Sequence, residues 1–238
     1  MTYNDRNPYI IQIGEHFTKS FCYQVFYSDS INNIPGFYKY DLGAISNVLQ
    51  TTTPGSPAYR DEMGKFSRGF FHFYVYKDYN KEMITVVDQI SVASFYYDDE
   101  LKPQEWTVLD DTMTILGYPC QKAICSFRGR DWEAWFTPDI PISEGPWKFY
   151  GLPGLIAKLE DTESHYCFEM IGFEKVNEPI HTYIDYYFRK MDRLSFLKLK
   201  MSNLNNELVA IDYAKIGISF SGEVKHYDHI ERDYKYSQ

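Results

Sequence analysis

Short runs in which hydrophobic and polar residues alternate make up most of the chain, and a period of two is typical of β-strands. In residues 131–137, Trp132 and Phe136 fall on one face, whereas Glu133 and Trp135 fall on the other. Residues 70–76 (FFHFYVY) carry aromatic side chains on both faces, which predicts a strand covered on both sides or lining a cavity. Bounding turn residues predict strands at residues 8–14, 70–76, 83–89, 90–97, 106–109, 113–116, 117–127, 131–137, 155–160, 165–174 and 182–189.

Near the C-terminus the apolar positions recur every three or four residues instead, and this spacing predicts one helix. Its apolar face runs from Leu194 to Ile211. We expect Asp192 to cap the first turn, with Ser195 as the alternative cap, and Gly217 to end the helix.

Many short strands and one late helix indicate an all-β to α+β protein. We expect a single domain over residues 1–238, built on a long curved antiparallel sheet, half-barrel-like, with one or two helices packed on it. Aromatic residues make up 18% of the chain, and Tyr and Phe favour strands. The less regular segments are residues 20–29 (strand or short helix), 42–50 (a helical turn or two), 51–68 (surface loop) and 218–238 (a peripheral C-terminal tail).

Charge and hydropathy narrow the classes of partner. The 238 residues include 33 Asp and Glu against 24 Lys and Arg, a net charge of −9, which disfavours general binding to nucleic acid. No run approaches the roughly 18 apolar residues that a membrane-spanning helix needs. The first residues lack the apolar segment of a secretory leader, so the chain is either cytosolic or begins after a leader.

Four cysteines leave the redox compartment open. Cys120 and Cys125 are five positions apart, so on a regular strand they point to opposite faces and do not bridge each other. With Cys22 and Cys167 they are either buried thiols or members of one or two disulfides, and disulfides fit an exported protein.

The segment 106–173 resembles the GLPGLI family, which is named for a hexapeptide that stands here at residues 151–156. The resemblance implies a diderm bacterial protein that usually carries a secretory leader, and hence a periplasmic or secreted location. It implies no catalytic residue. The matching positions are Ile11-Gln12-Ile13-Gly14, Gly117-Tyr118, Cys120, Lys122-Ala123, Phe127, Gly129-Arg130, Ala134-Trp135-Phe136-Thr137, Ile140-Pro141, Gly145-Pro146 and the hexapeptide itself.

The hexapeptide has a structural interpretation that needs no chemistry. Pro153 suits position i+1 of a type II turn, and Gly154 supplies the positive φ at i+2. Gly151 then sets the approach of the preceding loop. The motif is therefore predicted to be a rigid corner between two hairpins, with the mouth of a ligand cavity as the alternative.

For function, the aromatic strands favour a non-enzymatic protein that binds an apolar small molecule or an extended peptide on its curved sheet, similar in architecture to periplasmic lipoprotein carriers. Arg128 and Arg130 flank a glycine at a predicted hairpin tip. They fit a small anion or carboxylate site, or else a solvated turn in which Arg130 pairs with Asp131 or Glu133. The candidate ligand-binding residues are Phe71, Phe73, Tyr97, Arg128, Arg130, Trp135 and Trp147.

Two other functions stay open. A metal-dependent hydrolase-type enzyme would use His226 and His229, which share a face if that segment is helical, although no third ligand is visible. An envelope assembly partner would dock through a sheet edge. The sequence contains no GxSxG, GxxxxGK[ST] or GxGxxG, so we predict no catalytic residue and no cofactor.

Overall fold

In the computed structural model, the described part of the chain comprises residues 8–23, 47–48, 50–53, 56–58, 73–90, 93–182, 188–210 and 229–235. Within these residues the protein is mostly β with one long helix, which confirms the predicted fold class. Residues 47, 48 and 50 are helical, as expected for the 42–50 segment. Phe71, Gly217 and His226, and most of the predicted 182–189 strand, lie outside the described residues. Among the described helices, none has the length and apolar character needed to cross a membrane.

The first sheet has six strands in the order β1-β2-β3-β4-β5-β11. Neighbouring strands are antiparallel, except that β11 runs parallel to β5. The described part of the ambiguous 20–29 segment thus belongs mainly to a strand, β2. The strands are β1 (Tyr9–Ile13), β2 (Phe17–Cys22), β3 (Tyr74–Asp78), β4 (Met83–Ile90), β5 (Ala93–Glu100) and β11 (Arg189–Lys190).

The second sheet has five antiparallel strands in the order β10-β9-β8-β7-β6. Residues 106–109 and 113–116, predicted as two strands, belong to the single strand β6, whose register shifts between Val108 and Thr112. The two residues between β7 and β8 both have positive φ, as in the turns that join twisted hairpins. The strands are β6 (Thr107–Ile115), β7 (Tyr118–Phe127), β8 (Arg130–Thr137), β9 (Leu155–Asp161) and β10 (Cys167–Glu169).

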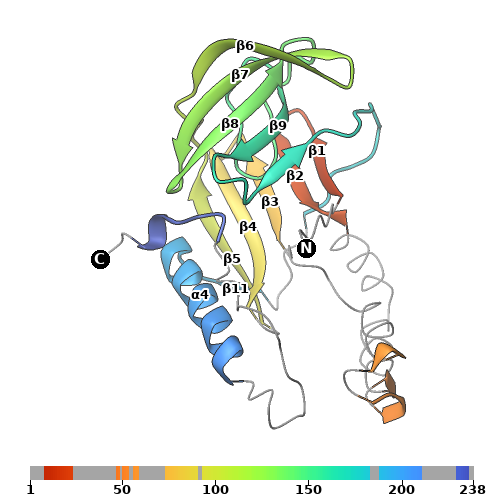
Figure 1. Ribbon diagram of the computed structural model, residues 1–238, viewed down its shortest axis with the longest axis vertical. Coiled ribbons are helices and arrows are strands. Elements are labelled where there is room, and N and C mark those ends of the chain that lie inside the picture. Colours follow the sequence, from red (N-terminus) through yellow and green to blue (C-terminus); the bar gives the residue numbers. More distant parts are fainter. Residues whose placement is uncertain are drawn as a thin grey trace.

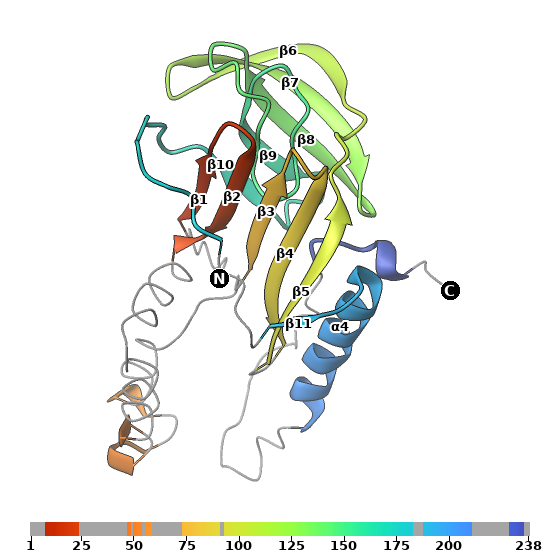
Figure 2. The same ribbon diagram turned by 180° about the vertical axis from the view of Figure 1, so that it is seen from behind.

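The strands thus form two sheets rather than the one long sheet expected. The chain passes from the first sheet to the second at residues 101–106, where Pro103 has no N–H to donate to a neighbouring strand. Figure 1 shows the five-stranded sheet above the six-stranded sheet, with α4 beside the β5 edge, and Figure 2 shows the same arrangement from behind. One hydrophobic core joins both sheets, because Val75 and Tyr97 belong to the same cluster as Trp132 and Leu159.

Both faces of β3 are covered by side chains. Val75 belongs to the core between the sheets, together with Phe73, the residue that precedes β3. Tyr74 and Tyr76 point to the other face, where they pack with Phe21 in a second cluster. Within the predicted 70–76 strand, the described aromatic residues Phe73, Tyr74 and Tyr76 are therefore buried against neighbours, and residues 70–72 lie outside the described part.

The predicted helix is α4 (Arg193–Ala210). Asp192 caps it, since its Oδ1 accepts a hydrogen bond from the N–H of Ser195 at 3.0 Å. Phe196 and Leu197 are buried, and the Phe196 ring lies 5.3 Å from that of Tyr97. The helix therefore packs on the six-stranded sheet, as expected.

Candidate functional site

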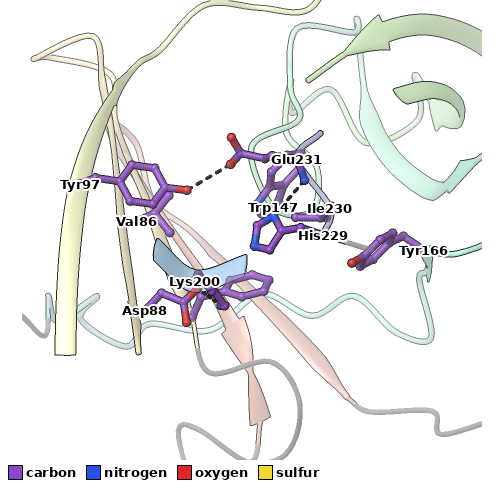
Figure 3. Close-up of a pocket in the computed structure, with 10 residues that line it drawn as sticks. Val86, Asp88, Tyr97, Trp147, Tyr166, Lys200, His229, Ile230 and Glu231 are labelled. Atoms are coloured by element: carbon purple, nitrogen blue, oxygen red, sulfur yellow. Dashed lines mark hydrogen bonds and ion pairs between the residues drawn. The ribbon is translucent and has the colours of Figure 1, made fainter. Parts of the chain in front are cut away.

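The two sheets, α4 and the crossing loop (residues 138–154, between β8 and β9) converge on residues 229–235, which we call the capping segment. We call the surface that it covers the junction. Figure 3 shows the residues around a small cavity there, which has a volume of about 20 Å³. Such a space holds one water molecule. The lining residues are Phe73, Val86, Asp88, Tyr97, Trp147, Tyr166, Lys200, His229, Ile230 and Glu231.

The first three residues of the capping segment are buried although the segment is highly charged. His229, Ile230 and Glu231 expose only 8%, 5% and 0% of their surface. The prediction of a peripheral C-terminal tail is therefore wrong for these three residues. The physical reason is that partners on several other elements satisfy the polar groups of the segment, so its charge does not hold it in water.

A lysine of the crossing loop supplies the first of these partners. Lys148 is fully buried, and its Nζ donates to Glu231 at 2.6 Å and to Asp99 of β5 at 2.9 Å. The hydroxyl of Tyr97 donates to the same carboxylate of Glu231 at 3.1 Å. Burial by itself raises the pKa of Glu231, but Lys148 and Arg193 outweigh it and hold that pKa below its usual value. Glu231 is therefore an ion-paired carboxylate.

Two arginines bind the second acid of the capping segment. Arg193, in the first turn of α4, donates to both carboxylate oxygens of Asp233, at 2.9 and 2.7 Å. Arg128, at the β7–β8 turn, reaches Asp233 at 3.1 Å and holds Asp99 through two bonds of 2.7 and 2.6 Å. Arg128 therefore pairs with carboxylates of the chain itself, and its binding of a small anion stays a prediction.

Arg130 holds the main chain of the capping segment. Its guanidinium donates to the carbonyls of His229 at 2.9 Å and Ile230 at 3.2 Å, and to Asp161 of β9 at 2.8 Å. The N–H of Arg232 donates to the carbonyl of Arg128 at 2.8 Å. Arg130 is buried because it begins β8 on the inward face, so the interpretation as a solvated turn is wrong for this residue.

His229 is held neutral inside the junction. Its Nδ1 accepts a hydrogen bond from the N–H of Glu231 at 3.1 Å. Burial and the nearby ammonium of Lys200 lower its pKa to about 4. Lys200 itself pairs with Asp88 of β4. The imidazole therefore accepts a proton less readily in the folded chain than in the unfolded one.

We predict a loss of stability on acidification that comes from His229. Between pH 6.5 and about 4 the unfolded chain binds a proton at this residue and the folded chain does not, so the free energy of unfolding falls as the pH falls. The full effect is about 3 kcal/mol. Urea denaturation from pH 7.5 to 4 measures it. His229→Asn keeps an acceptor for the Glu231 N–H and should flatten the slope; an equally steep slope in this variant would refute the assignment.

Among the described residues, one group has donors close enough together for a metal ion: Asp161, Glu163 and His165. Two guanidinium groups already occupy these donors. Arg130 lies 2.8 Å from Asp161 and 3.2 Å from His165, and Arg232 binds Glu163 twice at 2.6 Å. The group is thus an ion-pair cluster. His229, a predicted weak metal candidate, is not part of it.

The structure divides the predicted ligand-binding residues among three places. Phe73, Tyr97 and Trp147 line the junction cavity. Arg128 and Arg130 line a depression of about 260 Å³ at the β7–β8 turn. Trp135 points to the opposite face of the five-stranded sheet, where the ammonium of Lys122 lies 5.8 Å from its ring. Phe71 lies outside the described residues.

The aromatic rings at the junction pack against one another. The Trp132 and Phe149 rings are 4.8 Å apart, and those of Trp147 and Phe149 are 5.5 Å apart. A pocket for a small ligand usually measures 300–1,000 Å³, far above the roughly 20 Å³ found here. The described residues therefore give no support to the predicted apolar-ligand cavity at this place.

The sequence did not single out four charged residues that meet here: Lys148, Arg193, Glu231 and Asp233. Lys148 did carry a usable signal, since it stands between Trp147 and Phe149 in the crossing loop. A lysine between two aromatic residues either reaches water because the chain turns there, or is buried beside an acidic residue. The counter-charge lies 83 positions away, so spacing alone could not identify it.

The hexapeptide forms a corner, but not the predicted turn. Gly154 is nearly extended, and the residue with a clearly left-handed φ, +97°, is Gly151. Gly154 is needed for space, because a Cβ at this position would lie 2.1 Å from the carbonyl oxygen of Thr137. Pro153 stands between the two glycines, just before β9. Of the four cysteines, Cys22, Cys120 and Cys125 are buried and Cys167 is exposed.

The described residues form two open β-sheets and one long helix that share a core. A family model described as "Protein of unknown function (Porph_ging)" matches residues 127–158, which include β8, the crossing loop and the hexapeptide. Among curated protein sequences, none matches this chain.

Two crystal forms of PNGF-II are among the solved structures that match this chain, and the P21 form is similar in fold. In its P21 crystal form the TM-score is 0.53 at 14% sequence identity, over 84% of this chain and 30% of that one. In its C2 crystal form the TM-score is 0.46 at the same identity and coverage. This chain thus spans less than a third of the length of PNGF-II, and an identity this low indicates a shared fold and nothing about activity.

Proposed function

We propose that the protein is a non-enzymatic binding protein, located in the periplasm or outside the cell, that holds an extended polypeptide segment at the junction. The location is supported by the resemblance of residues 106–173 to a family that usually carries a secretory leader. The single observation that carries the proposed function is the capping segment, a stretch of polypeptide that is already held there.

The contacts of the capping segment are those of a bound peptide. Arg130 and the Arg128 carbonyl hold its main chain, and the side chains of Ile230 and Glu231 are buried on the surface below. Main-chain bonds that give affinity, and buried side chains that give specificity, are the features of extended-peptide recognition.

A hydrolase at this place has less support. The carboxylates of Asp99, Glu231 and Asp233 are each paired with a cation, and Nδ1 of His229 accepts a main-chain hydrogen bond. These groups are therefore engaged in holding the chain together. Docking through the β6 edge is also disfavoured, because the register shift and the acidic pair at residues 110–111 oppose the addition of another strand.

A peptide of residues 229–235 (HIERDYK) tests the proposed function. Labelled with fluorescein, it is titrated with the full-length chain carrying Glu231→Gln and Asp233→Asn, which weaken the chain's own capping segment. We expect saturable binding by fluorescence anisotropy, at least tenfold tighter than to the unaltered chain, because a tethered segment competes at an effective concentration in the mM range.

A scrambled peptide of the same composition is the control and should not saturate. If the double variant does not fold, Asp233→Asn alone replaces it, since the Asp233 side chain is 28% exposed and its change is tolerated more easily. The absence of saturable binding by a folded variant would refute the proposed function.

A further inference from the structure

We propose that the segment recognised at the junction is acidic, with two carboxylates at positions i and i+2 and an apolar residue just before the first. This inference rests on the proposed function and names the class of its ligand. It starts from the charges that face the capping segment, which are unusual for a chain with a net charge of −9.

The first carboxylate site receives Glu231. It is built from the fully buried ammonium of Lys148, the hydroxyl of Tyr97 and the guanidinium of Arg193. Among the described residues, a neutral side chain here would leave Asp99 as the carboxylate that still pairs with Lys148. An under-compensated buried charge is strongly unfavourable, so this site selects an acid.

The second carboxylate site receives Asp233 and lies nearer to the surface. Arg193 binds both of its oxygens, in the paired geometry that suits a guanidinium and a carboxylate. Arg128 adds a third bond at 3.1 Å. Because Arg193 contacts Glu231 and Asp233 together, it fixes the spacing of the two acids as well as their charge.

The described surroundings of the capping segment carry more cations than acids. Outside the segment, four buried or half-buried cations face it, and the described acids paired with them are Asp99 and Asp161. Lys200 and Asp88 form a separate balanced pair. Glu231 and Asp233 place two carboxylates against these cations. The four cations are Arg128, Arg130, Lys148 and Arg193.

The positions around the two acids add further selectivity. Ile230, just before the first acid, is buried at 5% exposure in the shared core. Arg232, between the acids, binds Glu163, whose side chain is half exposed. Because Glu163 is half exposed, this pair is weakened by water more than the buried pair of Glu231 with Lys148, so the intervening position accepts a wider range of residues than the first acidic position does.

Three peptides test this inference against the weakened full-length chain used above: HIERDYK, its neutral form HIQRNYK, and HIREDYK, in which the acids are adjacent. We expect HIERDYK to bind about 30-fold or more tightly than HIQRNYK, as for other charge pairs at the centre of an interface. HIREDYK should bind at least tenfold more weakly than HIERDYK. The difference between HIERDYK and HIQRNYK should shrink as salt is added.

Substitutions in the junction locate the effect. Arg193→Gln in the weakened chain should reduce the preference for HIERDYK over HIQRNYK to a few-fold. Lys122→Gln is the matched control, because Lys122 pairs with Glu133 on the opposite face of the sheet, and it should leave the preference unchanged.

The outcomes separate the two proposals. Equal binding of HIERDYK and HIQRNYK would overturn the acidic ligand and leave the proposed function standing. An undiminished preference in Arg193→Gln would also overturn it, since the acids would then bind elsewhere. Binding of none of the peptides by a folded chain would overturn the proposed function itself.

Discussion

Replacing Gly154 with alanine is expected to destabilise the protein by more than 4 kcal/mol or to prevent its folding. A Cβ at this position would lie 2.1 Å from the carbonyl oxygen of Thr137, 2.6 Å from its carbon and 3.0 Å from Cα of Pro138. All three are main-chain atoms where β8 ends, so relief of the clash requires a shift of the strand itself. Overpacking that displaces a backbone belongs among the most damaging single substitutions.

The free energy of unfolding in urea, followed by circular dichroism, measures this effect. Gly172→Ala is the matched control, because a Cβ there would meet no atom within 4 Å, and its effect should stay within about 0.5 kcal/mol. If Gly154→Ala were as stable as Gly172→Ala, the close approach of the hexapeptide to Thr137 would be wrong.

Removing the negative charge of Glu144 is expected to cost about 3–5 kcal/mol of stability. Glu144 is buried in the crossing loop and accepts bonds from Lys77 at 2.6 Å, from Thr18 at 2.6 Å and from Tyr79. Lys77 is completely buried, and burial lowers its pKa even though Glu144 acts in the opposite direction. In the Glu144→Gln variant, the Lys77 ammonium stays in the core and loses the carboxylate that pairs with it.

A double variant separates the charge from the packing. Lys77→Met with Glu144→Gln removes the stranded ammonium and should recover a large part of the loss. Glu100→Gln is the control, since Glu100 forms an exposed pair with Lys102 and such pairs contribute at most about 1 kcal/mol. A loss in Glu144→Gln no larger than in Glu100→Gln would show that the buried pair does not hold the crossing loop to the first sheet.

The local elements were predictable because their signals are local. The alternation across Trp132, Glu133 and Trp135 gave the correct faces of β8, and Asp192 gave the correct start of α4. The division into two sheets was not predictable, because it depends on which strands pair across long stretches of the chain. A period of two predicts that a segment is a strand, but it does not predict which other strand it pairs with.

The site was only partly predictable, for the same reason. Phe73, Tyr97 and Trp147 do meet at one place, but their rings pack together and the space expected between them is filled. The burial of Glu231 follows from Lys148 and Arg193, which belong to elements far from it in the sequence. The charged composition of the C-terminal residues predicted a peripheral tail. Residues 229–231 are buried because their partners lie on elements that surround them.

The most direct test of peptide binding at the junction is a crystal structure of the chain carrying Glu231→Gln and Asp233→Asn, grown with HIERDYK in which selenomethionine replaces the isoleucine. The predicted result is a selenium anomalous peak beside Trp147 and Tyr166, where Ile230 lies now, with the two peptide carboxylates on Lys148 and Arg193. A junction still filled by the chain's own residues 229–235, with the peptide elsewhere or absent, would contradict the account.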